Sequence, residues 1–293
     1  MNNIKIAVAS GKGGTGKTMV ATSMAASLSS NICVQFLDCD AEAPNAHLFL
    51  KPQIAHTHNA EILIPEINSE LCTACGRCVE VCEFNALAML QQKILVFSQL
   101  CHGCGSCFLN CPTNAITEVP RKIGEIRTGA THSGIKFSMG ELTVSEPMPT
   151  PIIRQLKGMM RNDVAVTLMD SPPGASCAVV ATLNNANFVL LVTEPTPFGL
   201  HDLKQIMGIL AKTGTPGGVI INRDGIGDDQ VDSFLAETKF PILMRIPYRE
   251  NIAVGLAKGA LLIDLMPEYR EQFIHVFDQI ELILKTPEAV DAR

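Results

Sequence analysis

A short run of residues near the N-terminus has the types and spacing of a phosphate-binding loop. It comprises Gly11, Lys12, Gly13, Gly14, Thr15, Gly16, Lys17 and Thr18. The apolar residues 4–9 before it predict a buried strand, and residues 19–28 after it predict a helix. Glycines let backbone N–H groups converge on anionic oxygens, and the helix N-terminus adds partial positive charge. The pattern therefore favours nucleotide binding over a turn without a ligand, with Lys17 on the β- and γ-phosphates and the Thr18 hydroxyl on Mg²⁺.

Acidic residues follow two further apolar segments at the point where each predicted strand ends. Residues 32–38 end in Asp38, which Asp40 follows closely, and residues 164–169 run into Asp170. Because the carboxyl ends of parallel strands meet at the ligand-binding edge of a doubly wound sheet, these carboxylates are expected beside the phosphates. A carboxylate there can hold the attacking water or reach Mg²⁺ through water, and the second role is predicted for Asp170. Solvated turns at the strand ends are the alternative.

Eight of the eleven cysteines fall into two runs with the same spacing, C-x₂-C-x₂-C-x₃-C. The runs are Cys72, Cys75, Cys78 and Cys82, and then Cys101, Cys104, Cys107 and Cys111. A shift of 29 positions overlays all eight, which indicates an internal duplication. Thiolates in this doubled spacing favour iron–sulfur clusters over structural zinc, which does not need eight thiolates.

The duplication resembles the two-cluster bacterial ferredoxin. This resemblance implies two [4Fe–4S] clusters, each held by three cysteines of one run and the fourth cysteine of the other. The first cluster would be held by Cys72, Cys75, Cys78 and Cys111, and the second by Cys82, Cys101, Cys104 and Cys107. Glu83 departs from the pattern, which usually has proline after the fourth cysteine, but this change removes no ligand. Electron transfer is the default use of two such clusters, and a purely structural role is the alternative.

Lys12 makes the phosphate-binding loop more particular, because an ordinary loop of this kind needs no second lysine after its first glycine. The run K-G-G-T-G-K-T resembles the deviant Walker A motif of the MinD/ParA/Mrp and nitrogenase-iron-protein class. The resemblance implies that Lys12 reaches across a homodimer to the phosphates of the partner's nucleotide. It also implies that Asp40 orients the attacking water and that Asp38 supports the magnesium end. Lys12, Lys17 and Asp40 are the predicted catalytic residues, and a solvated loop lysine is the alternative for Lys12.

The same resemblance assigns a few residues near the γ-phosphate and the base. Gly174 corresponds to the switch II glycine, whose N–H meets the γ-phosphate. Asn222 and Arg223, at the end of another apolar strand, correspond to the adenine-reading position, and an Asn amide can pair with adenine through two hydrogen bonds. Pro247 and Tyr248 lie where the class forms the other wall of the base pocket. A turn at Gly174 and a strand-end cap at Asn222 are the alternatives.

Three cysteines lie outside the two runs. Cys33 and Cys39 are interpreted as packing residues. Cys177 follows Asp170 by seven residues, a spacing shared with a nitrogenase-iron-protein cysteine that ligates a cluster between two subunits. The other bridging cysteine of that protein has no evident counterpart here. A small buried residue at a helix start is therefore the favoured interpretation of Cys177.

The wider sequence predicts the elements that must position these groups. Hydrophobic residues make up 47% of the 293 residues, and five or more apolar strands alternate with helices. This pattern predicts an α/β fold with a doubly wound, mainly parallel sheet. The resemblances add that this is a P-loop NTPase with an inserted α+β ferredoxin-like domain. Residues 1–59 and 121–293 are assigned to a discontinuous ATPase domain, and residues 60–120 to the insert.

The segments that flank the insert are predicted to differ from each other. Residues 51–60 carry proline, polar residues and the pair His56 and His58, without strand or helix periodicity. They predict a solvated linker loop with a domain boundary near Asn59, although two histidines at this spacing could bind a metal. Residues 121–150 predict a hairpin-like return into the ATPase domain.

Charge and hydropathy limit the expected binding partners and cellular location of the chain. The net charge of −6 disfavours broad attraction to nucleic acid or anionic lipid. No run of about 18 apolar residues predicts a membrane span, and the first strand leaves no room for a signal peptide. We therefore expect a cytoplasmic protein with no nucleic-acid and no membrane partner. Residues 268–285 predict an amphipathic last helix whose acidic polar face favours packing on the sheet over membrane binding.

Together these features predict an ATP-binding and ATP-hydrolysing iron–sulfur protein that uses ATP, Mg²⁺ and two [4Fe–4S] clusters. In the leading hypothesis, nucleotide gates a homodimer or paralogue heterodimer and couples slow, partner-stimulated hydrolysis to electron transfer to a redox protein. The alternative is an ATPase that assembles or carries a metallocofactor or iron–sulfur cluster for an acceptor protein. A positioning ATPase like MinD or ParA is the weaker alternative, because the chain and its last helix are acidic.

Overall fold

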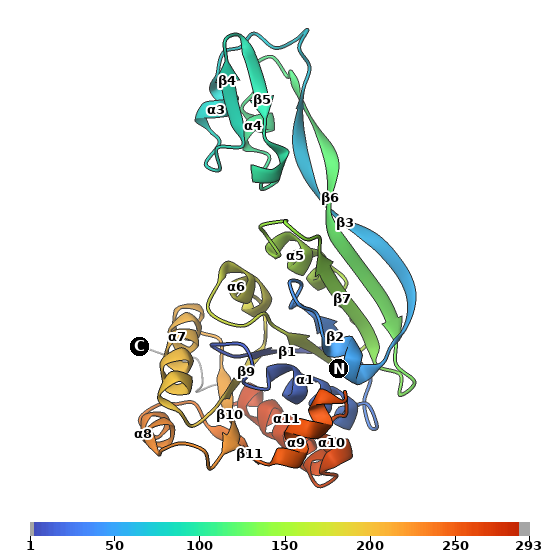
Figure 1. The fold of residues 1–293 in the computed structure, drawn as a ribbon, viewed down its shortest axis with the longest axis vertical. Coiled ribbons are helices and arrows are strands. Elements are labelled where there is room, and N and C mark those ends of the chain that lie inside the picture. Colours follow the sequence, from blue (N-terminus) through green and yellow to red (C-terminus); the bar gives the residue numbers. More distant parts are fainter. Residues whose placement is uncertain (1–2, 287–293) are drawn as a thin grey trace.

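The computed structural model describes residues 3–286 and shows a nine-stranded sheet in the body of the molecule (Figure 1). The strands are β1 (Ile4–Ala9), β2 (Val34–Asp38), β3 (Gln53–Ile67), β6 (Ile116–Ala130), β7 (Lys136–Leu142), β8 (Val166–Asp170), β9 (Phe188–Thr193), β10 (Gly217–Asp224) and β11 (Ile242–Pro247). Their spatial order is β11-β10-β9-β1-β8-β2-β7-β6-β3. The strands from β11 to β7 are parallel, and β6 and β3 join one edge as antiparallel strands. The predicted α/β fold with a mainly parallel sheet is confirmed.

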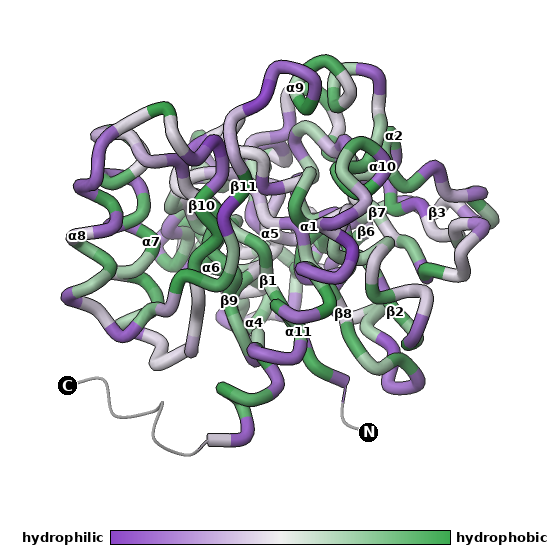
Figure 2. Tube along the Cα trace, turned by 90° about the horizontal axis from the view of Figure 1, so that it is seen from below, coloured by the Kyte–Doolittle hydropathy of each residue, from purple (hydrophilic) through white to green (hydrophobic). Residues whose placement is uncertain are grey.

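Helices cover both faces of the sheet, so its central strands are apolar on both sides (Figure 2). The helices are α1 (Lys17–Leu28), α2 (Ala46–Leu50), α5 (Thr150–Gly158), α6 (Cys177–Leu183), α7 (Pro197–Thr213), α8 (Gln230–Ala236), α9 (Glu250–Ala257), α10 (Leu262–Leu265) and α11 (Tyr269–Lys285). Along β1, Ile6 and Val8 join the core under α1 and α11, whereas Ala7 and Ala9 join the core under α5, α6 and α7. The two cores hold the strand ends, and therefore the phosphate-binding loop, in place.

The predicted packing of the last helix is confirmed. One face of α11 carries Phe273, Val276, Phe277 and Ile280, all buried in the core that α1 shares. Within residues 3–286, no helix is both long enough and apolar enough to cross a membrane.

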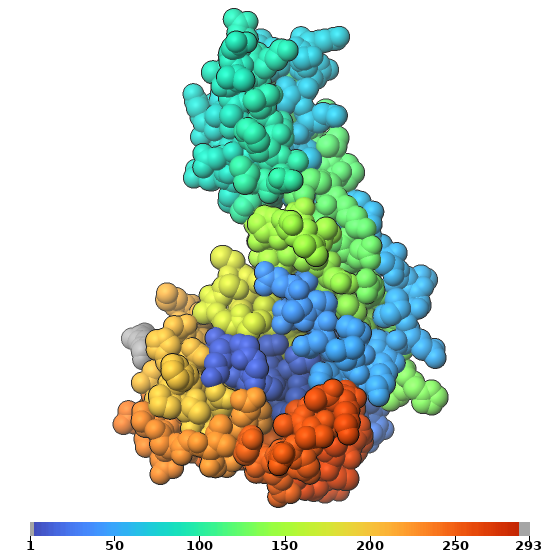
Figure 3. All heavy atoms as spheres, in the orientation of Figure 1, coloured from blue at the N-terminus to red at the C-terminus, as the bar shows by residue number. Residues whose placement is uncertain are grey.

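A small module stands away from the body at the end of a two-stranded arm formed by β3 and β6 (Figures 1 and 3). The module contains α3 (Arg77–Glu80), β4 (Leu87–Leu90), β5 (Lys93–Val96), the 3₁₀ turn η1 (Ser98–Leu100) and α4 (Ser106–Leu109). Strands β4 and β5 form a hairpin, and Cys78, Leu87 and Ile116 form the centre of a separate small core. The module therefore has its own core, and the arm connects it to the sheet.

The predicted linker loop at residues 51–60 is wrong, because most of this segment belongs to β3. Its exposed histidines, His56 and His58, pair in register with Thr128 and Ile126 of β6. The long antiparallel ladder with β6 imposes the extended backbone, and no buried face is present to give the segment an alternating pattern. The predicted hairpin-like return after the insert is confirmed by the pairing of β6 with β7.

Candidate functional site

The phosphate-binding loop lies between β1 and α1 and is held in place by the end of β10. Gly14 and Gly16 adopt positive φ angles of 80° and 91°, which a side chain would strain. The Asn222 side-chain amide donates a hydrogen bond to the Thr15 carbonyl at 2.7 Å. Gly16 lies so close to this amide that an added Cβ would collide with its nitrogen. Glycine is therefore required at position 16 by both the backbone conformation and the approach of Asn222.

Lys17 and Thr18, the first residues of α1, both contact the Asp170 carboxylate at the end of β8. Lys17 Nζ donates to Oδ1 at 2.8 Å, and Thr18 Oγ1 donates to Oδ2 at 2.6 Å. Parallel pairing of β1 with β8 places Val8 opposite Asp170 and so brings the loop to this carboxylate. Burial lowers the pKa of Lys17, but attraction to Asp170 outweighs this effect and raises that pKa above its ordinary value. Lys17 therefore remains a cation at the position predicted to contact phosphate.

Asp38 and Asp40 follow β2, the other neighbour of β8, but their surroundings differ. Asp38 is fully buried. Its oxygens accept hydrogen bonds at 3.0–3.2 Å from three backbone N–H groups of the following loop, those of Asp40, Asn45 and Ala46. Burial, together with the nearby Asp170 carboxylate, raises the pKa of Asp38 to about 8. Asp38 thus organises the loop that carries Asp40, whose own pKa burial raises to about 6.

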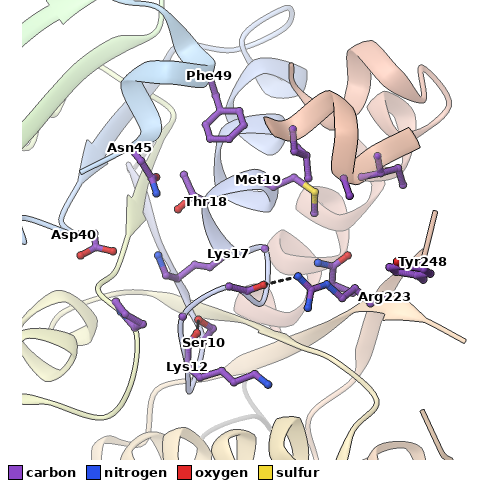
Figure 4. Close-up of a pocket in the computed structure, with 18 of the residues that line it drawn as sticks. Ser10, Lys12, Lys17, Thr18, Met19, Asp40, Asn45, Phe49, Arg223 and Tyr248 are labelled. Atoms are coloured by element: carbon purple, nitrogen blue, oxygen red, sulfur yellow. Dashed lines mark hydrogen bonds between the residues drawn. The ribbon is translucent and has the colours of Figure 1, made fainter. Parts of the chain in front are cut away.

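A cleft of about 540 Å³ is lined by most of the residues predicted to bind nucleotide (Figure 4). These lining residues are Lys12, Gly13, Gly14, Gly16, Lys17, Thr18, Asp40, Asn222, Arg223, Pro247 and Tyr248. The other predicted residues, Gly11, Thr15, Asp38, Asp170 and Gly174, are not part of its lining. Lys17, Thr18 and Asp40 lie toward one end of the cleft, and Arg223 and Tyr248 toward the other (Figure 4). This is the separation expected between the phosphate end and the base end of a nucleotide.

Gly174 makes a different contact from the one that the resemblance implies. Its N–H donates to the Ser10 carbonyl at 3.0 Å. Contact between this N–H and a γ-phosphate would require the bond to Ser10 to break.

The sequence did not predict one wall of the cleft. It is formed by Asn45, by Phe49 of α2, and by Arg249, Ile252, Ala253 and Leu256 at and within α9. Helical spacing groups Ile252 with Leu256, but a helix packed in the core carries the same signal. Only the position of Asn45, five residues after Asp40, pointed to this wall.

Glu194 was also missed, although it contacts two of the predicted residues. Lys12 Nζ donates to Glu194 Oε1, and Arg223 Nη1 donates to Glu194 Oε2 at 2.9 Å. Arg223 Nη2 also donates to the Gly14 carbonyl at 3.0 Å, the bond drawn in Figure 4. Glu194 directly follows the apolar strand β9, the same signal that identified Asp170. That signal was therefore sufficient to find Glu194.

Two small pockets in the module divide the eight cysteines of the paired runs. One pocket is lined by Cys72, Cys75, Cys78 and Cys111, and the other by Cys82, Cys101, Cys104 and Cys107. Backbone N–H groups donate to sulfur in three places: Ala86 to Cys82 at 3.3 Å, Gly103 to Cys101 at 3.4 Å and Ala115 to Cys111 at 3.3 Å. Within residues 3–286, no group of three or more His, Cys, Asp and Glu side chains could hold a metal ion. The pockets thus sort the thiols into fours without forming a single-ion site.

Two interpretations of the remaining cysteines are wrong. Cys33 precedes β2 and Cys177 begins α6, and both are exposed rather than packed in a core. Each of the two cysteines lies at the end of a helix or strand. There the local direction of the chain decides whether the side chain is exposed, and the spacing of residues in the sequence does not predict it. Cys39 is fully buried as predicted, and burial raises the pKa of its thiol.

Comparison with known families agrees with this geometry. The CobQ/CobB/MinD/ParA nucleotide binding domain matches residues 6–262. The chain belongs to this family. It is a P-loop ATPase of this family. Two relatives are the uncharacterized proteins MJ0578 and MJ0579 of Methanocaldococcus jannaschii. Each is 30% identical to this chain, the first over 95% of this chain and 96% of its own length, the second over 87% and 89%.

Solved structures of MinD share the fold. The septum site-determining protein MinD complexed with Mg-ADP from Pyrococcus horikoshii OT3 is 18% identical, with a TM-score of 0.58 over 97% of this chain and 98% of that one. The cell division ATPase MinD of Pyrococcus furiosus is 19% identical, with a TM-score of 0.58 over 97% and 100%. The MinC:MinD cell division protein complex of Aquifex aeolicus matches with a TM-score of 0.57, at 14% identity over 95% and 96%.

Gly16→Ala tests the loop geometry. The added methyl group meets the Asn222 amide and strains a positive φ, so we expect Mg-ADP to bind at least about tenfold more weakly. Isothermal titration calorimetry gives the dissociation constant. Gly158→Ala, at the end of α5 where an added Cβ meets no atom, is the matched control and should bind normally. Unchanged affinity in Gly16→Ala would contradict the proposed loop geometry.

Asp40 gives a pH dependence to the stability of the nucleotide-free protein. Its pKa is about 6 in the folded chain against an ordinary value of 3.8, so the folded state keeps a proton that the unfolded state releases from about pH 4 upward. The stabilising contribution is present below pH 4 and is lost as the pH rises through 6. We therefore expect Asp40→Asn to make the urea midpoint fall less between pH 5 and pH 7 than in the wild type. Circular dichroism measures this midpoint.

The control for this experiment is Asp278→Asn, which changes an exposed carboxylate on α11. Its pH dependence should match that of the wild type. Equal slopes for Asp40→Asn and the wild type would show that Asp40 does not carry this pH dependence.

Proposed function

We propose that this chain is an ATP-binding and ATP-hydrolysing iron–sulfur protein in which nucleotide gates a dimer and couples ATP to electron transfer through two [4Fe–4S] clusters. One observation carries the proposal: a nucleotide-type cleft and two four-cysteine pockets occur in one chain, joined by a continuous strand ladder. In this proposal residues 1–59 and 121–293 form the ATPase domain, and residues 60–120 form a ferredoxin-like insert. The arrangement would place the protein near the nitrogenase iron protein within its family.

The proposed nucleotide chemistry uses residues that line or adjoin the cleft. Lys17 would contact the β- and γ-phosphates, Thr18 would ligate Mg²⁺, and Asp170 would reach that ion through water. Asp40 is partly exposed at the cleft and is proposed to orient the attacking water. Asn222, Arg223, Pro247 and Tyr248 would surround the base. In our proposal Asp38 acts indirectly, since its oxygens hold the loop that carries Asp40.

The chemistry of the cysteine pockets fits iron–sulfur clusters. Four sulfurs around one zinc ion must all lie about 2.3 Å from a single point. A cube instead offers a separate iron atom to each sulfur, so its ligands surround a volume. The two pockets are each lined by four thiols, and together they hold the eight cysteines of the doubled spacing, which suits two cubes. The N–H groups directed at Cys82, Cys101 and Cys111 would stabilise thiolates there. When bound, such clusters supply one-electron transfer.

The surface of the module supports a protein partner that receives electrons. Ten large apolar side chains between residues 63 and 109 are exposed: Leu63, Leu71, Phe84, Met89, Leu90, Leu95, Phe97, Leu100, Phe108 and Leu109. Leu71, Leu100 and Phe108 are direct sequence neighbours of cysteines that line the pockets. Exposed apolar surface of this extent is typical of an interaction site. Residues 60–120 also carry six Glu against one Arg and one Lys, which suits a basic partner surface.

Assembly or transfer of an iron–sulfur cluster remains the alternative function. One cysteine in each pocket, Cys75 and Cys104, is exposed, and an exposed ligand gives an acceptor protein access to a cluster. Positioning activity of the MinD or ParA kind is the weaker alternative, because the similar structures share only the fold and the acidic α11 packs on the body.

Iron content tests the clusters. We expect about eight iron atoms and eight sulfides per chain after anaerobic purification, with signals of reduced clusters in electron paramagnetic resonance. Cys111→Ser should lose about half of this iron, because it removes one ligand of one cluster. Cys33→Ser, which changes an exposed cysteine outside both runs, is the control and should keep all of it. Equal iron in the two variants, or zinc in place of iron, would contradict the proposal.

Lys17→Ala tests the coupling between the two sites. Loss of the phosphate contact should abolish ATP turnover and any effect of Mg-ATP on the cluster spectra, while iron content stays normal. Lys258→Ala, which changes an exposed lysine beyond α9, should behave as the wild type. If Lys17→Ala stops turnover but leaves electron or cluster delivery to an acceptor unchanged, the two modules merely share a chain. Thr18→Ala gives the same test and leaves Lys17, the charged partner of Asp170, in place.

A further inference from the structure

Glu194 is a buried carboxylate that neutralises two cations from separate segments of the chain. Its side chain is only 6% exposed, and it accepts Lys12 on one oxygen and Arg223 on the other. Arg223 also binds the Gly14 carbonyl, so this cluster links the end of β9, the end of β10 and the phosphate-binding loop. A buried carboxylate with two cationic partners remains paired when one of them leaves.

The backbone around Glu194 is held in place by several contacts, whereas the Lys12 side chain that Glu194 binds is not. The Thr196 hydroxyl accepts the Gly199 N–H at 3.0 Å and caps α7. Gly199 lies against the Glu194 carbonyl so closely that an added Cβ would collide with it. Glu194 therefore presents its carboxylate from a rigid turn.

Lys12 is the partner that is free to leave. Apart from Glu194, its ammonium contacts the exposed ring of Phe198, whose centroid lies 5.9 Å from Nζ, and no backbone carbonyl within residues 3–286 holds it. Figure 4 shows the Lys12 side chain extending away from Lys17, so its ammonium does not lie beside the phosphate end of its own cleft. Arg223, in contrast, is fixed by its second bond to Gly14.

We propose that Glu194 is a positioning residue that holds Lys12 within its own subunit in the resting state and releases it when Mg-ATP closes the dimer. This inference rests on the proposed nucleotide-gated dimer, in which Lys12 serves the partner's nucleotide. Glu194 and the partner's nucleotide therefore compete for Lys12. This competition weakens dimerisation, because only the fraction of chains with a released Lys12 can complete the site across the interface. Arg223 stays on Glu194 after release and keeps the carboxylate paired.

A purely structural role for Glu194 predicts something different. If Glu194 served only to anchor the loop through Arg223 and Gly14, its removal would loosen the nucleotide site and would not depend on Lys12. The positioning role instead predicts that every effect of changing Glu194 on dimerisation requires Lys12.

The first experiment measures whether Glu194 restrains Lys12 in the nucleotide-free chain. Trace acylation with acetic anhydride, read by mass spectrometry, gives the reactivity of Lys12 relative to the exposed Lys258. Loss of a partly buried ion pair should raise Lys12 reactivity roughly three- to tenfold in Glu194→Gln. Glu237→Gln removes the same charge from an exposed site after α8 and should leave it unchanged. Equal reactivity in the wild type and Glu194→Gln overturns the proposal.

The second experiment measures dimerisation by analytical ultracentrifugation with the non-hydrolysable analogue AMPPNP and Mg²⁺. We expect the Glu194→Gln dimer to dissociate at a concentration roughly three- to tenfold lower than the wild type, and Glu237→Gln to match the wild type. Lys12→Ala and Lys12→Ala/Glu194→Gln should behave identically to each other. Weaker or unchanged dimerisation of Glu194→Gln, or an effect that persists without Lys12, overturns the proposal.

The two readouts separate this inference from the function on which it rests. A wild-type chain that stays monomeric at every AMPPNP concentration contradicts the gated dimer and with it the release step, whereas Lys12 acylation still reports the resting contact. Melting temperatures of all variants establish that each is folded.

Discussion

The contact of one buried carboxylate, Asp170, with both Lys17 and Thr18 joins the central sheet to the phosphate-binding loop and the first helix. An unpaired carboxylate at this depth would be strongly destabilising, so the loop conformation and the β1–β8 register depend on each other. Asp38 and Asp40 lie close enough to act on the charge of the same lysine. Three carboxylates therefore share one buried cation, and burial leaves the pKa values of Asp38 and Asp40 raised. At neutral pH the raised pKa keeps a proton on Asp38, so the negative charge beside Lys17 comes mainly from Asp170 and Asp40.

Two groups that our proposal directs at a γ-phosphate are bound to other groups of their own chain in this structure. The Gly174 N–H donates to Ser10, and Lys12 is held by Glu194. In that proposal a triphosphate would replace both contacts, and its higher affinity for the rearranged state would drive closure. In this proposed resting form Lys17 already lies at the expected phosphate position, whereas Lys12 and the Gly174 N–H do not yet face the γ-phosphate. Such a division would let a diphosphate bind without triggering the rearrangement.

The sequence was most informative where chemistry restricts the residue type. A tight loop around anionic oxygens requires glycine and lysine, so the phosphate-binding loop could be described before the fold was known. The division of the eight cysteines into two fours came instead from the resemblance to the two-cluster ferredoxin, and the two pockets of the module group the cysteines in the same way. Continuous apolar runs located the parallel strands for a similar reason, because both faces of the sheet are covered. The errors occur where three-dimensional context decides. His56 and His58 lie in an exposed ribbon without a buried face, Cys33 and Cys177 lie at the ends of elements, and Ile252 faces the cleft with a pattern that a core helix shares.

The position of α5 shows how the module could respond to the nucleotide site. Its Ile152 packs directly against Gly124 of β6 and Gly140 of β7, where any larger residue would collide. Gln155 donates to the Glu61 carbonyl of the arm at 2.9 Å, and Lys157 donates to the last carbonyls of α6, including Ala181 at 2.8 Å. Because α6 begins a few residues after Asp170 and Gly174, α5 contacts both the arm and the segment that, in our proposal, would move if the Gly174 N–H left Ser10. The arm is thus held at its base both by the pairing of β6 with β7 and by these contacts with α5. In our proposal, α5 is therefore the element through which a movement of α6 would reach the arm.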